Sequence, residues 1–369
     1  MKLEERIRQY NQIRSPKDRT HVCHAPFVSL NFEQNGNVTA CCYNRSHVLG
    51  RYPQSSISEI WNQPKVEELR QAMRDNDLSL GCRLCYDQLM AGNFESMLTK
   101  NFDRLPINGE EAIKRGPFIL EFEISNACNL ECVMCNGYFS SSIRKNREKL
   151  PPLPNPYDDK FVDQLTLYLP NLVWAKFLGG EPFLNPLYFR IWEKMIELQT
   201  QTLVVITTNA TIMNERVKNV LQRVKPLLVL SIDSMRKETY EKIRVNAKYD
   251  QVQKNLEIFL DYARKNGRTI DLAICPMTMN WEEIPSLFDW GTRETVQVNL
   301  NTVVSPHELS LRSLPKKQLR EIVQYYKSTT LKTWKDFYED PAPWTKTISQ
   351  NNQNIFKGFI NQVEHWSEE

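Results

Sequence analysis

The stretch FILEFEISNACNLECVMC, residues 118–135, joins a short apolar run to three closely spaced cysteines. The run at 118–125 is followed by polar residues, which predicts a β-strand that leads into a loop. This loop places Cys128, Cys132 and Cys135 at CxxxCxxC spacing. A structural zinc site closes with four ligands, whereas three thiolates on a cubane iron–sulfur cluster leave one iron open. We therefore interpret the loop as a place where a cluster could bind a further ligand.

Downstream of this loop, apolar runs and amphipathic stretches alternate. Strands are predicted at 118–125, 173–180, 203–210, 227–233, 269–275 and 296–304. The clearest helix between them stops at Gly267, and its apolar face consists of Val252, Leu256, Phe259, Leu260 and Ala263. Strands that alternate with helices form a parallel sheet, and six such units fit a partial (β/α)6 TIM-like barrel. The site is expected at the carboxyl ends of the strands, where the loops gather.

The overall composition limits the possible partners and compartments. The 47 basic and 44 acidic residues give a formal net charge of +3, which does not support nucleic acid as a partner. The charged start MKLEERIRQY and the absence of an apolar run of about 18 residues predict a cytoplasmic protein with no membrane segment. In a reducing compartment, clustered cysteines are more often metal ligands than disulfides. Eight of the nine cysteines lie within the first 135 residues, so the pattern indicates metal.

The two ends of the chain differ from its middle. Residues 1–100 contain short segments, a turn at Asn35-Gly36 and one predicted helix near 64–75, and are expected to form a small domain held together by its five cysteines. The barrel is expected over 116–310. Residues 311–369 are predicted to form a helical extension, whose apolar positions are Ile355, Phe359, Val363 and Trp366. The proline-rich stretch at 150–159 is expected to be a loop. The predicted fold class is thus α/β.

A second motif, GGEP at 179–182, ends the second predicted strand. CxxxCxxC and GGEP together resemble the signature of the radical S-adenosylmethionine (radical SAM) superfamily. The resemblance implies the partial barrel, a [4Fe–4S] cluster on the three loop cysteines, and S-adenosylmethionine on the open iron. It also implies that Gly179 and Gly180 let the backbone approach closely and that Glu181 helps to receive the methionine ammonium of the cofactor.

Polar residues at the later strand ends receive cofactor-binding roles from the same resemblance. These residues are Thr208, Asn209, Ser231, Asp233 and Arg244. In peptide-modifying relatives such positions meet the carboxylate and ribose of the cofactor, and an arginine can pair with the carboxylate. A second interpretation of Asp233 is that it caps the following helix. Met134 stands where the family often has an aromatic residue near the adenine, and its thioether can pack there.

The amino-terminal cysteines resemble an abbreviated SPASM or twitch module, which carries an auxiliary cluster. The pattern C-x12-G-x4-C spans 23–41 with Gly36 inside it, and a CxxC pair follows at 82–85. The module normally follows the barrel, whereas here it precedes it. The resemblance implies a second [4Fe–4S] cluster held by Cys23, Cys41, Cys82 and Cys85, with Cys42 as a possible substitute. Four ligands leave no open iron, so this cluster would transfer electrons or staple the domain. Tetrahedral zinc is the alternative.

The predicted function is that of an enzyme that cleaves S-adenosylmethionine reductively to a 5′-deoxyadenosyl radical and takes hydrogen from a substrate. Crosslinking or oxidation of a ribosomal peptide is the first choice, with a reductant such as flavodoxin or ferredoxin. The alternative enzyme is an epimerase or dehydrogenase of a sugar or other small molecule. Cys275, at the end of the fifth predicted strand, is its candidate hydrogen donor, although such a cysteine can also be an inert apolar side chain. From a different class, the chain could be a zinc-stapled binding protein.

Overall fold

The computed structural model describes residues 2–104 and 112–369. Within these residues, strands form one sheet in the order β3-β2-β1-β4-β5-β6-β7-β8-β9. Their bounds are β1 (Ser29–Glu33), β2 (Asn37–Thr39), β3 (Gly50–Arg51), β4 (Ile119–Glu123), β5 (Trp174–Phe177), β6 (Leu203–Thr208), β7 (Leu227–Ser231), β8 (Ile270–Ile274) and β9 (Gln297–Leu300). Strands β4 to β9 are parallel and fall within the six predicted runs. The partial barrel is therefore confirmed.

The outer faces of β4 and β5 carry buried aromatic side chains. Phe122 of β4 lies opposite Phe177 of β5, and both side chains are inaccessible to solvent. Phe177 packs edge to face on Trp192 of α9, with ring centroids 5.3 Å apart. Each strand keeps such an apolar face toward the helices, which is why the sequence marks the strands clearly.

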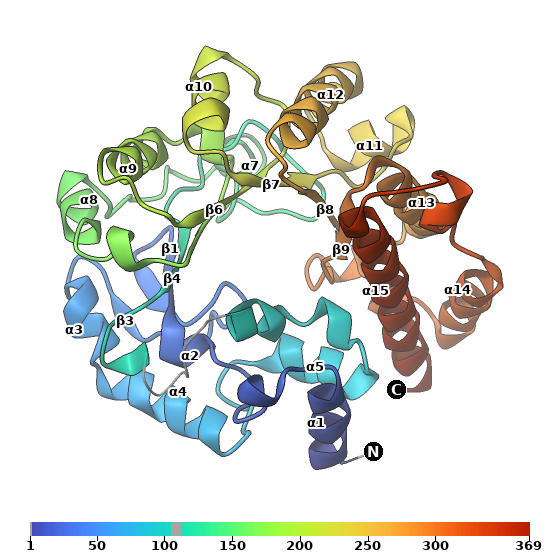
Figure 1. Ribbon diagram of the computed structural model, residues 1–369, viewed down its shortest axis with the longest axis horizontal. Helices are drawn as coiled ribbons and strands as arrows, with labels where there is room; N and C mark the ends of the chain where they lie inside the picture. Colours follow the sequence, from blue (N-terminus) through green and yellow to red (C-terminus); the bar gives the residue numbers. More distant parts are fainter. Residues whose placement is uncertain (1, 105–111) are drawn as a thin grey trace.

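Helices surround the arc of strands (Figure 1). Their bounds are α1 (Leu3–Gln12), α2 (Ala25–Val28), α3 (Ile57–Trp61), α4 (Pro64–Arg74), α5 (Arg83–Ala91), α7 (Ser141–Asn146), α8 (Asp159–Leu165), α9 (Pro186–Glu197), α10 (Glu215–Arg223), α11 (Lys237–Ile243), α12 (Tyr249–Lys265), α13 (Ile284–Glu294), α14 (Lys316–Ser328) and α15 (Pro343–Glu368). The helices predicted near 64–75, 252–263 and 355–366 correspond to α4, α12 and α15. Residues 151–158 contain neither helix nor strand, as expected for the proline-rich loop.

The amino-terminal region extends the barrel sheet. Strand β1 runs parallel to β4, with Asn31 opposite Glu121, and β2 and β3 continue the sheet in antiparallel pairing. No strand was predicted at 29–33, because SLNFE is short and its pairing partner lies far away in the sequence. The predicted turn at Asn35-Gly36 separates β1 from β2. Gly36 has φ +87°, and a Cβ there would lie 2.2 Å from the carbonyl oxygen of Tyr52, so the position requires glycine.

The amino-terminal region also spans the open side of the barrel. Figure 1 shows its helices between the β3 edge of the sheet and the carboxyl-terminal helix α15, with both chain ends on that side. Asn93 donates from Nδ2 to Oε1 of Gln362 on α15 at 2.7 Å. Arg312 forms an ion pair with Asp87 of α5 at 3.5 Å. These contacts tie the amino-terminal region to the carboxyl-terminal side of the barrel, and its strand β1 pairs with β4 on the other side.

Two candidate cysteine centres

The loop after β4 is held in shape by the serines that follow it. Ser141 Oγ accepts the Cys128 N–H at 3.1 Å, and the Ser142 hydroxyl donates to the Cys128 carbonyl at 2.7 Å. The Ser140 hydroxyl donates to the Leu130 carbonyl at 2.7 Å, and its oxygen caps α7. The run of serines after the cysteines therefore fixes the loop backbone by local hydrogen bonds.

The other side of the loop pairs with the segment after α11. The Glu131 N–H donates to the Val245 carbonyl and the Val133 N–H to the Ile243 carbonyl, each at 3.0 Å. The Leu130 N–H points at Cys128 Sγ, 3.5 Å away. Because both sides are bonded to the rest of the fold, the loop geometry is set by protein contacts.

The three thiols differ in exposure. Cys132 is buried, whereas Cys128 and Cys135 are half-buried. Burial raises the pKa of Cys128 to about 11 and that of Cys135 to about 12. Burial also raises the pKa of Cys132, although the nearby Arg244 opposes this. The thiols thus keep their protons at neutral pH until a metal displaces them. Three soft sulfur donors on one loop fit iron–sulfur ligation.

The GGEP turn packs directly against the backbone that leads into this loop. Gly179 and Gly180 have φ angles of +83° and +57°. A Cβ on Gly179 would lie 2.8 Å from the Glu123 Cα, and one on Gly180 would lie 2.3 Å from the Ala127 carbonyl oxygen. The Glu181 N–H donates to that same carbonyl at 2.7 Å. Only glycine permits this approach, so the predicted close packing of the motif is present.

The Glu181 carboxylate is fully buried and is occupied by donors from the chain itself. Its Oε1 accepts the Thr208 hydroxyl at 2.8 Å and the Phe183 N–H at 3.1 Å, and its Oε2 accepts the Asn209 N–H at 2.8 Å. Burial raises the Glu181 pKa to about 7, although these hydrogen bonds lower it. The carboxylate ties the end of β5 to the end of β6. We propose that it shapes the cofactor site; the expected contact with the methionine ammonium stays a prediction.

Asn209 links the end of β6 to the cysteine loop. Its side-chain amide donates to Asn129 Oδ1 at 3.0 Å and lies 4.0 Å from Cys128 Sγ. Of the two residues predicted here to bind the cofactor, Asn209 therefore lies beside the first cysteine of the loop, and Thr208 contacts Glu181. Their cofactor contacts remain a proposal.

Asp233 and Arg244 form a buried ion pair that touches the same loop. Arg244 donates from Nε to Asp233 Oδ2 at 2.6 Å, and its Nη1 lies 3.7 Å from Cys132 Sγ. Asp233 Oδ1 accepts the Cys275 N–H at 2.7 Å. Asp233 does not cap the following helix α11, whose N-cap residue is Arg236. Its carboxylate instead accepts hydrogen bonds from Arg244 and from the backbone after β8. Asp233 orients the guanidinium toward the cysteine loop.

The remaining predicted residues lie around this pair. Ser231 is the last residue of β7 and is half-buried, opposite Ala273 of β8. Met134 and Cys275 both pack against a small apolar cluster of Ile243, Met277 and Val303. Burial raises the pKa of Cys275, so this thiol stays protonated beside the cysteine loop.

The second cysteine group encloses a cavity. Cys23, Cys41, Cys82 and Cys85 all line it, together with apolar side chains such as Leu69, Met73, Leu78 and Phe102. The Ala25 N–H points at Cys23 Sγ at 3.4 Å, and the Asn44 amide points at Cys82 Sγ at 3.5 Å. Burial raises the pKa of Cys82 to about 11 and of Cys41 to about 12. The four cysteines that were expected to act together therefore converge on one enclosed space.

Cys42 has different surroundings. Its backbone N–H donates to Glu121 Oε2 at 2.8 Å, and its thiol lies 3.9 Å from Oε1 of the same carboxylate. Of the described residues that line the cavity, Cys41 is one and Cys42 is not. The structure therefore favours Cys41, although ligation by either residue remains a proposal.

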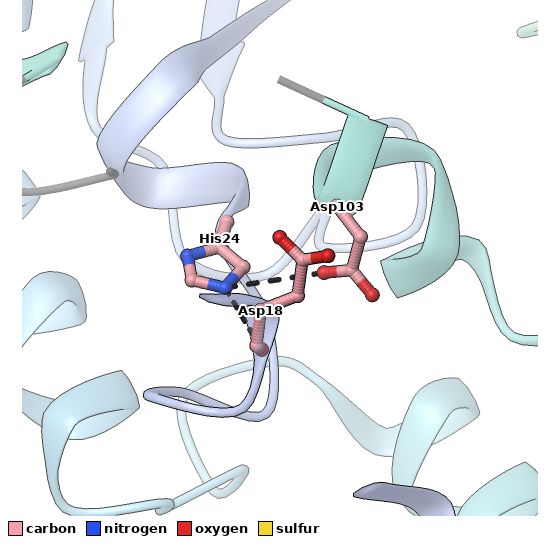
Figure 2. Close-up of side chains that lie close together, drawn as sticks. All are labelled: Asp18, His24 and Asp103. Atoms are coloured by element: carbon pink, nitrogen blue, oxygen red, sulfur yellow. Dashed lines mark hydrogen bonds and ion pairs between the residues drawn. The ribbon is translucent and has the colours of Figure 1, made fainter. Parts of the chain in front are cut away.

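A separate group near Cys23 has the spacing of a metal site (Figure 2). Among the described residues, Asp18, His24 and Asp103 bring three possible ligand atoms within 4.8 Å of one another. His24 Nε2 faces the Asp18 carbonyl oxygen at 3.1 Å, which requires a proton on that nitrogen. Both oxygens of Asp103 accept hydrogen bonds from Arg14, at 2.7 and 2.8 Å. The His24 and Asp103 side chains therefore already have hydrogen-bond partners within the protein, and these bonds hold the segment that carries Cys23 in place.

Family models match both cysteine-bearing parts of the chain. The radical SAM superfamily model matches residues 122–291, and the SPASM iron–sulfur cluster-binding domain model matches residues 23–86. The chain contains a radical SAM domain, and a SPASM domain precedes it. The two domains imply [4Fe–4S] clusters and S-adenosylmethionine as its cofactors.

Individual relatives are more distant. The chain is 25% identical over 181 residues to an AdoMet-dependent heme synthase of Methanosarcina barkeri and 28% identical over 122 residues to an uncharacterized protein of Methanocaldococcus jannaschii. These matches cover 48% and 31% of this chain, and the chain spans 48% and 38% of those proteins. Solved structures with similarity include Streptococcus suis SuiB bound to S-adenosylmethionine, with 17% identity, a TM-score of 0.42, and coverage of 69% of this chain and 60% of SuiB. Another is anSMEcpe with bound AdoMet, with 18% identity, a TM-score of 0.43, and coverage of 56% and 58%.

The interior of the radical SAM barrel contains charged residues that were not predicted as site residues. Arg45 donates to both oxygens of Glu123 at 2.9 and 2.7 Å and to Glu33 at 3.2 Å. Its guanidinium lies over the Phe139 ring, 4.9 Å from the centroid. Lys176 lies 3.8 Å from the buried Glu121. The alternation in ILEFE (119–123), which places two glutamates on one face of a buried strand, was the available signal.

Within the described residues, no helix is both long and apolar enough to cross a membrane.

Proposed function

We propose that this chain cleaves S-adenosylmethionine reductively and uses the resulting radical to take a hydrogen atom from a peptide substrate. The observation that carries the proposal is the contrast between the two sites at the barrel: a partly accessible loop with three cysteines and an enclosed cavity with four. Three ligands on one cluster leave an iron free for the cofactor, and four leave none. The cluster supplies the electron that breaks the sulfonium bond of S-adenosylmethionine.

The residues of the chain would position that cofactor. Cys128, Cys132 and Cys135 would hold the first cluster, and the glycine turn at 179–180 would let the backbone approach the methionine part. Arg244, oriented by Asp233, is placed to pair with a carboxylate beside the cluster, because its guanidinium already faces Cys132. These roles follow from donor chemistry and position.

The cavity of Cys23, Cys41, Cys82 and Cys85 would hold the auxiliary cluster. The match of residues 23–86 to the SPASM iron–sulfur cluster-binding model supports a cluster over a single zinc ion at this site. A cluster with four protein ligands has no open iron, so it would accept an electron from a substrate radical or staple the domain.

The charged barrel interior supports a polar substrate. Arg45, Glu33, Glu123 and Lys176 line the side near the amino-terminal domain, as expected for a ligand that carries several hydrogen-bonding groups, such as a peptide. The protein would then act in the cytoplasm, and a flavodoxin or ferredoxin would supply electrons. Cys275 packs against Met277 beside the cysteine loop. A hydrogen-donor role for it, and with it the epimerase alternative, depends on whether a substrate reaches that position.

Anaerobic reconstitution followed by reaction with dithionite and S-adenosylmethionine tests the chemistry, and formation of 5′-deoxyadenosine is expected. Peptide and small-molecule fractions from cells grown on deuterated nutrients then test the substrate class. Deuterium in the 5′-deoxyadenosine is expected only with the peptide fraction. Transfer from the small-molecule fraction alone would replace the peptide proposal with the epimerase or dehydrogenase alternative, and a colourless zinc protein would overturn both.

A further inference from the structure

The segment Cys41–Arg45 lies between the two cysteine centres. Its first residue, Cys41, lines the amino-terminal cavity. Its last residue, Arg45, reaches Glu123 at the end of β4 and stacks on Phe139, four residues after the last cysteine of the barrel loop. Five consecutive residues thus contact both sites.

Tyr43 is the member of this segment that reaches furthest across. Its side chain lines the amino-terminal cavity, and its hydroxyl donates to Asn301 Oδ1 at 3.4 Å. Asn301 follows β9 and extends its pairing with β8, because its N–H donates to the Ile274 carbonyl at 2.8 Å. The phenol therefore connects the cavity wall with the carboxyl ends of β8 and β9.

Hydrogen bonds continue from that point to the barrel loop. The residue after Ile274 is Cys275, whose N–H donates to Asp233 at 2.7 Å. Asp233 accepts Arg244 Nε at 2.6 Å, and Arg244 Nη1 lies 3.7 Å from Cys132 Sγ. A continuous series of covalent and hydrogen bonds therefore runs from Cys41 through Tyr43 and Asn301 to Cys132.

We propose that Tyr43 is a positioning residue for electron transfer between the two cysteine centres, and that Asn301 is its partner on the barrel. The proposal rests on the proposed function. One electron would pass from the reduced amino-terminal centre to the oxidised barrel centre. The transfer would leave the amino-terminal centre oxidised and the barrel centre reduced. No bond forms or breaks and no proton moves. The electron that a substrate radical deposits in the enclosed centre could thereby return to the site where the cofactor is cleaved.

The remaining contacts of the segment support a coupling role over simple packing. The Asn44 amide donates to the Leu80 carbonyl at 2.8 Å and faces Cys82 Sγ, which fixes the loop on the cavity side. Arg45 fixes it on the barrel side through two carboxylates that are almost fully buried. The two residues that follow Tyr43 are therefore both fixed, which limits the freedom of its ring to leave the cavity wall and Asn301.

The test follows the amino-terminal centre directly. Both centres are reduced anaerobically, the excess reductant is removed, and S-adenosylmethionine is added without substrate. Freeze-quench electron paramagnetic resonance then records the decay of the signal from the amino-terminal centre. This signal is identified beforehand from the spectrum of a variant that lacks the barrel-loop cysteines and so contains only the amino-terminal centre. In the unmodified protein we expect this signal to decay and about two 5′-deoxyadenosine molecules to form per chain, one for each stored electron. Because no substrate is present, each 5′-deoxyadenosyl radical takes its hydrogen atom from a C–H bond of the protein or the buffer.

Tyr43→Leu should slow the decay about tenfold, equivalent to about 1.4 kcal/mol in the barrier, and leave only about one rapid 5′-deoxyadenosine per chain. Tyr43→Phe keeps the ring and loses only the long bond to Asn301, so we expect a smaller slowing. Tyr86→Leu is the matched control, because Tyr86 also directly follows a cysteine of the amino-terminal region but packs against Arg83. It should leave the decay unchanged.

The outcomes separate the two proposals. If Tyr43→Leu retains both clusters and its signal decays at the unmodified rate, the inference about Tyr43 is wrong while the proposed function stands. If the unmodified protein forms no 5′-deoxyadenosine, the proposed function itself fails. If Tyr43→Leu loses its amino-terminal iron, Tyr43→Phe is used for the test instead. If the amino-terminal signal of Tyr43→Phe decays at the unmodified rate, and the reduction potential of that centre is unchanged, the role of the Asn301 contact is overturned.

Discussion

The two cysteine centres are built in different ways. The barrel loop brings three cysteines together within eight residues, fixes them with neighbouring serines, and leaves two of the thiols half-buried. The amino-terminal cavity collects four cysteines from three separate segments and encloses them in apolar side chains. A locally built site can stay accessible to a cofactor because the fold does not have to close over it. A site assembled from distant segments becomes part of the core, so removal of one of its ligands should lower the stability of the protein.

The largest effect that tests this contrast concerns activity. Cys132→Ala removes one ligand of the proposed catalytic cluster, and formation of 5′-deoxyadenosine should fall below detection because no side chain can replace the cofactor chemistry. The loop is held by backbone contacts that do not involve the thiol. The melting temperature of the metal-free protein should therefore change little. Chromatography of the reaction products and thermal unfolding provide the two readings.

A large drop in melting temperature for Cys132→Ala would contradict the idea of a loop fixed by its own hydrogen bonds. Ser142→Ala is a useful companion, because it removes the bond to the Cys128 carbonyl and keeps all three thiols. We expect it to retain the cluster and to lose part of the activity.

The second test reverses the comparison. Cys85→Ala removes a ligand from the enclosed cavity, and the metal-loaded protein should lose roughly 5 kcal/mol or more of stability, since binding by a structural metal site is coupled to folding. Cys42→Ala is the matched control. Its thiol faces Glu121, so iron content and stability should stay close to those of the unmodified protein. Iron analysis measures the metal content, and denaturant unfolding measures the stability. Equal iron loss in Cys85→Ala and Cys42→Ala would show that the proposed set of four cavity ligands is wrong.

The sequence predicted the locally built centre better than the assembled one. The barrel strands were visible because each has an apolar face that packs under the helices, and the cysteine loop was visible because ligands close in sequence leave a motif. Strand β1 was missed, since its five residues gain their structure from pairing with β4. Tyr43, Arg45 and Lys176 were missed for the same reason. Nothing near them in the chain indicates that they meet Asn301, Glu123 and Glu121.

The third test concerns the ion pair that borders the barrel loop. Asp233→Asn leaves the Arg244 charge buried without its partner, which should destabilise the protein by about 3–5 kcal/mol. The guanidinium would also lose its fixed orientation toward Cys132. The apparent affinity for S-adenosylmethionine should therefore fall in the variant that remains folded, and isothermal titration of the reconstituted protein measures this.

The exposed pair of Lys237 and Asp250 serves as the control for that test. Its groups are 2.7 Å apart but largely solvated, so Lys237→Gln should leave stability nearly unchanged. If Asp233→Asn and Lys237→Gln lower the free energy of unfolding equally, burial does not increase the contribution of the Asp233–Arg244 pair to stability.

The smallest expected effect is a pH dependence set by Glu181. Burial places its pKa at about 7 in the folded protein, against an ordinary value of 4.5, so the folded state keeps a proton that the unfolded chain releases. The stabilisation is complete below pH 4.5 and is lost as the pH rises to about 7, by roughly 3 kcal/mol for a shift of this size. Urea unfolding of the metal-free protein at pH 5 and pH 8 should therefore show a larger decline for the unmodified chain than for Glu181→Gln, in which the group cannot titrate. Parallel declines would mean that the donors from Thr208, Phe183 and Asn209 hold the carboxylate charged throughout, and that the strand ends are tied by a full negative charge.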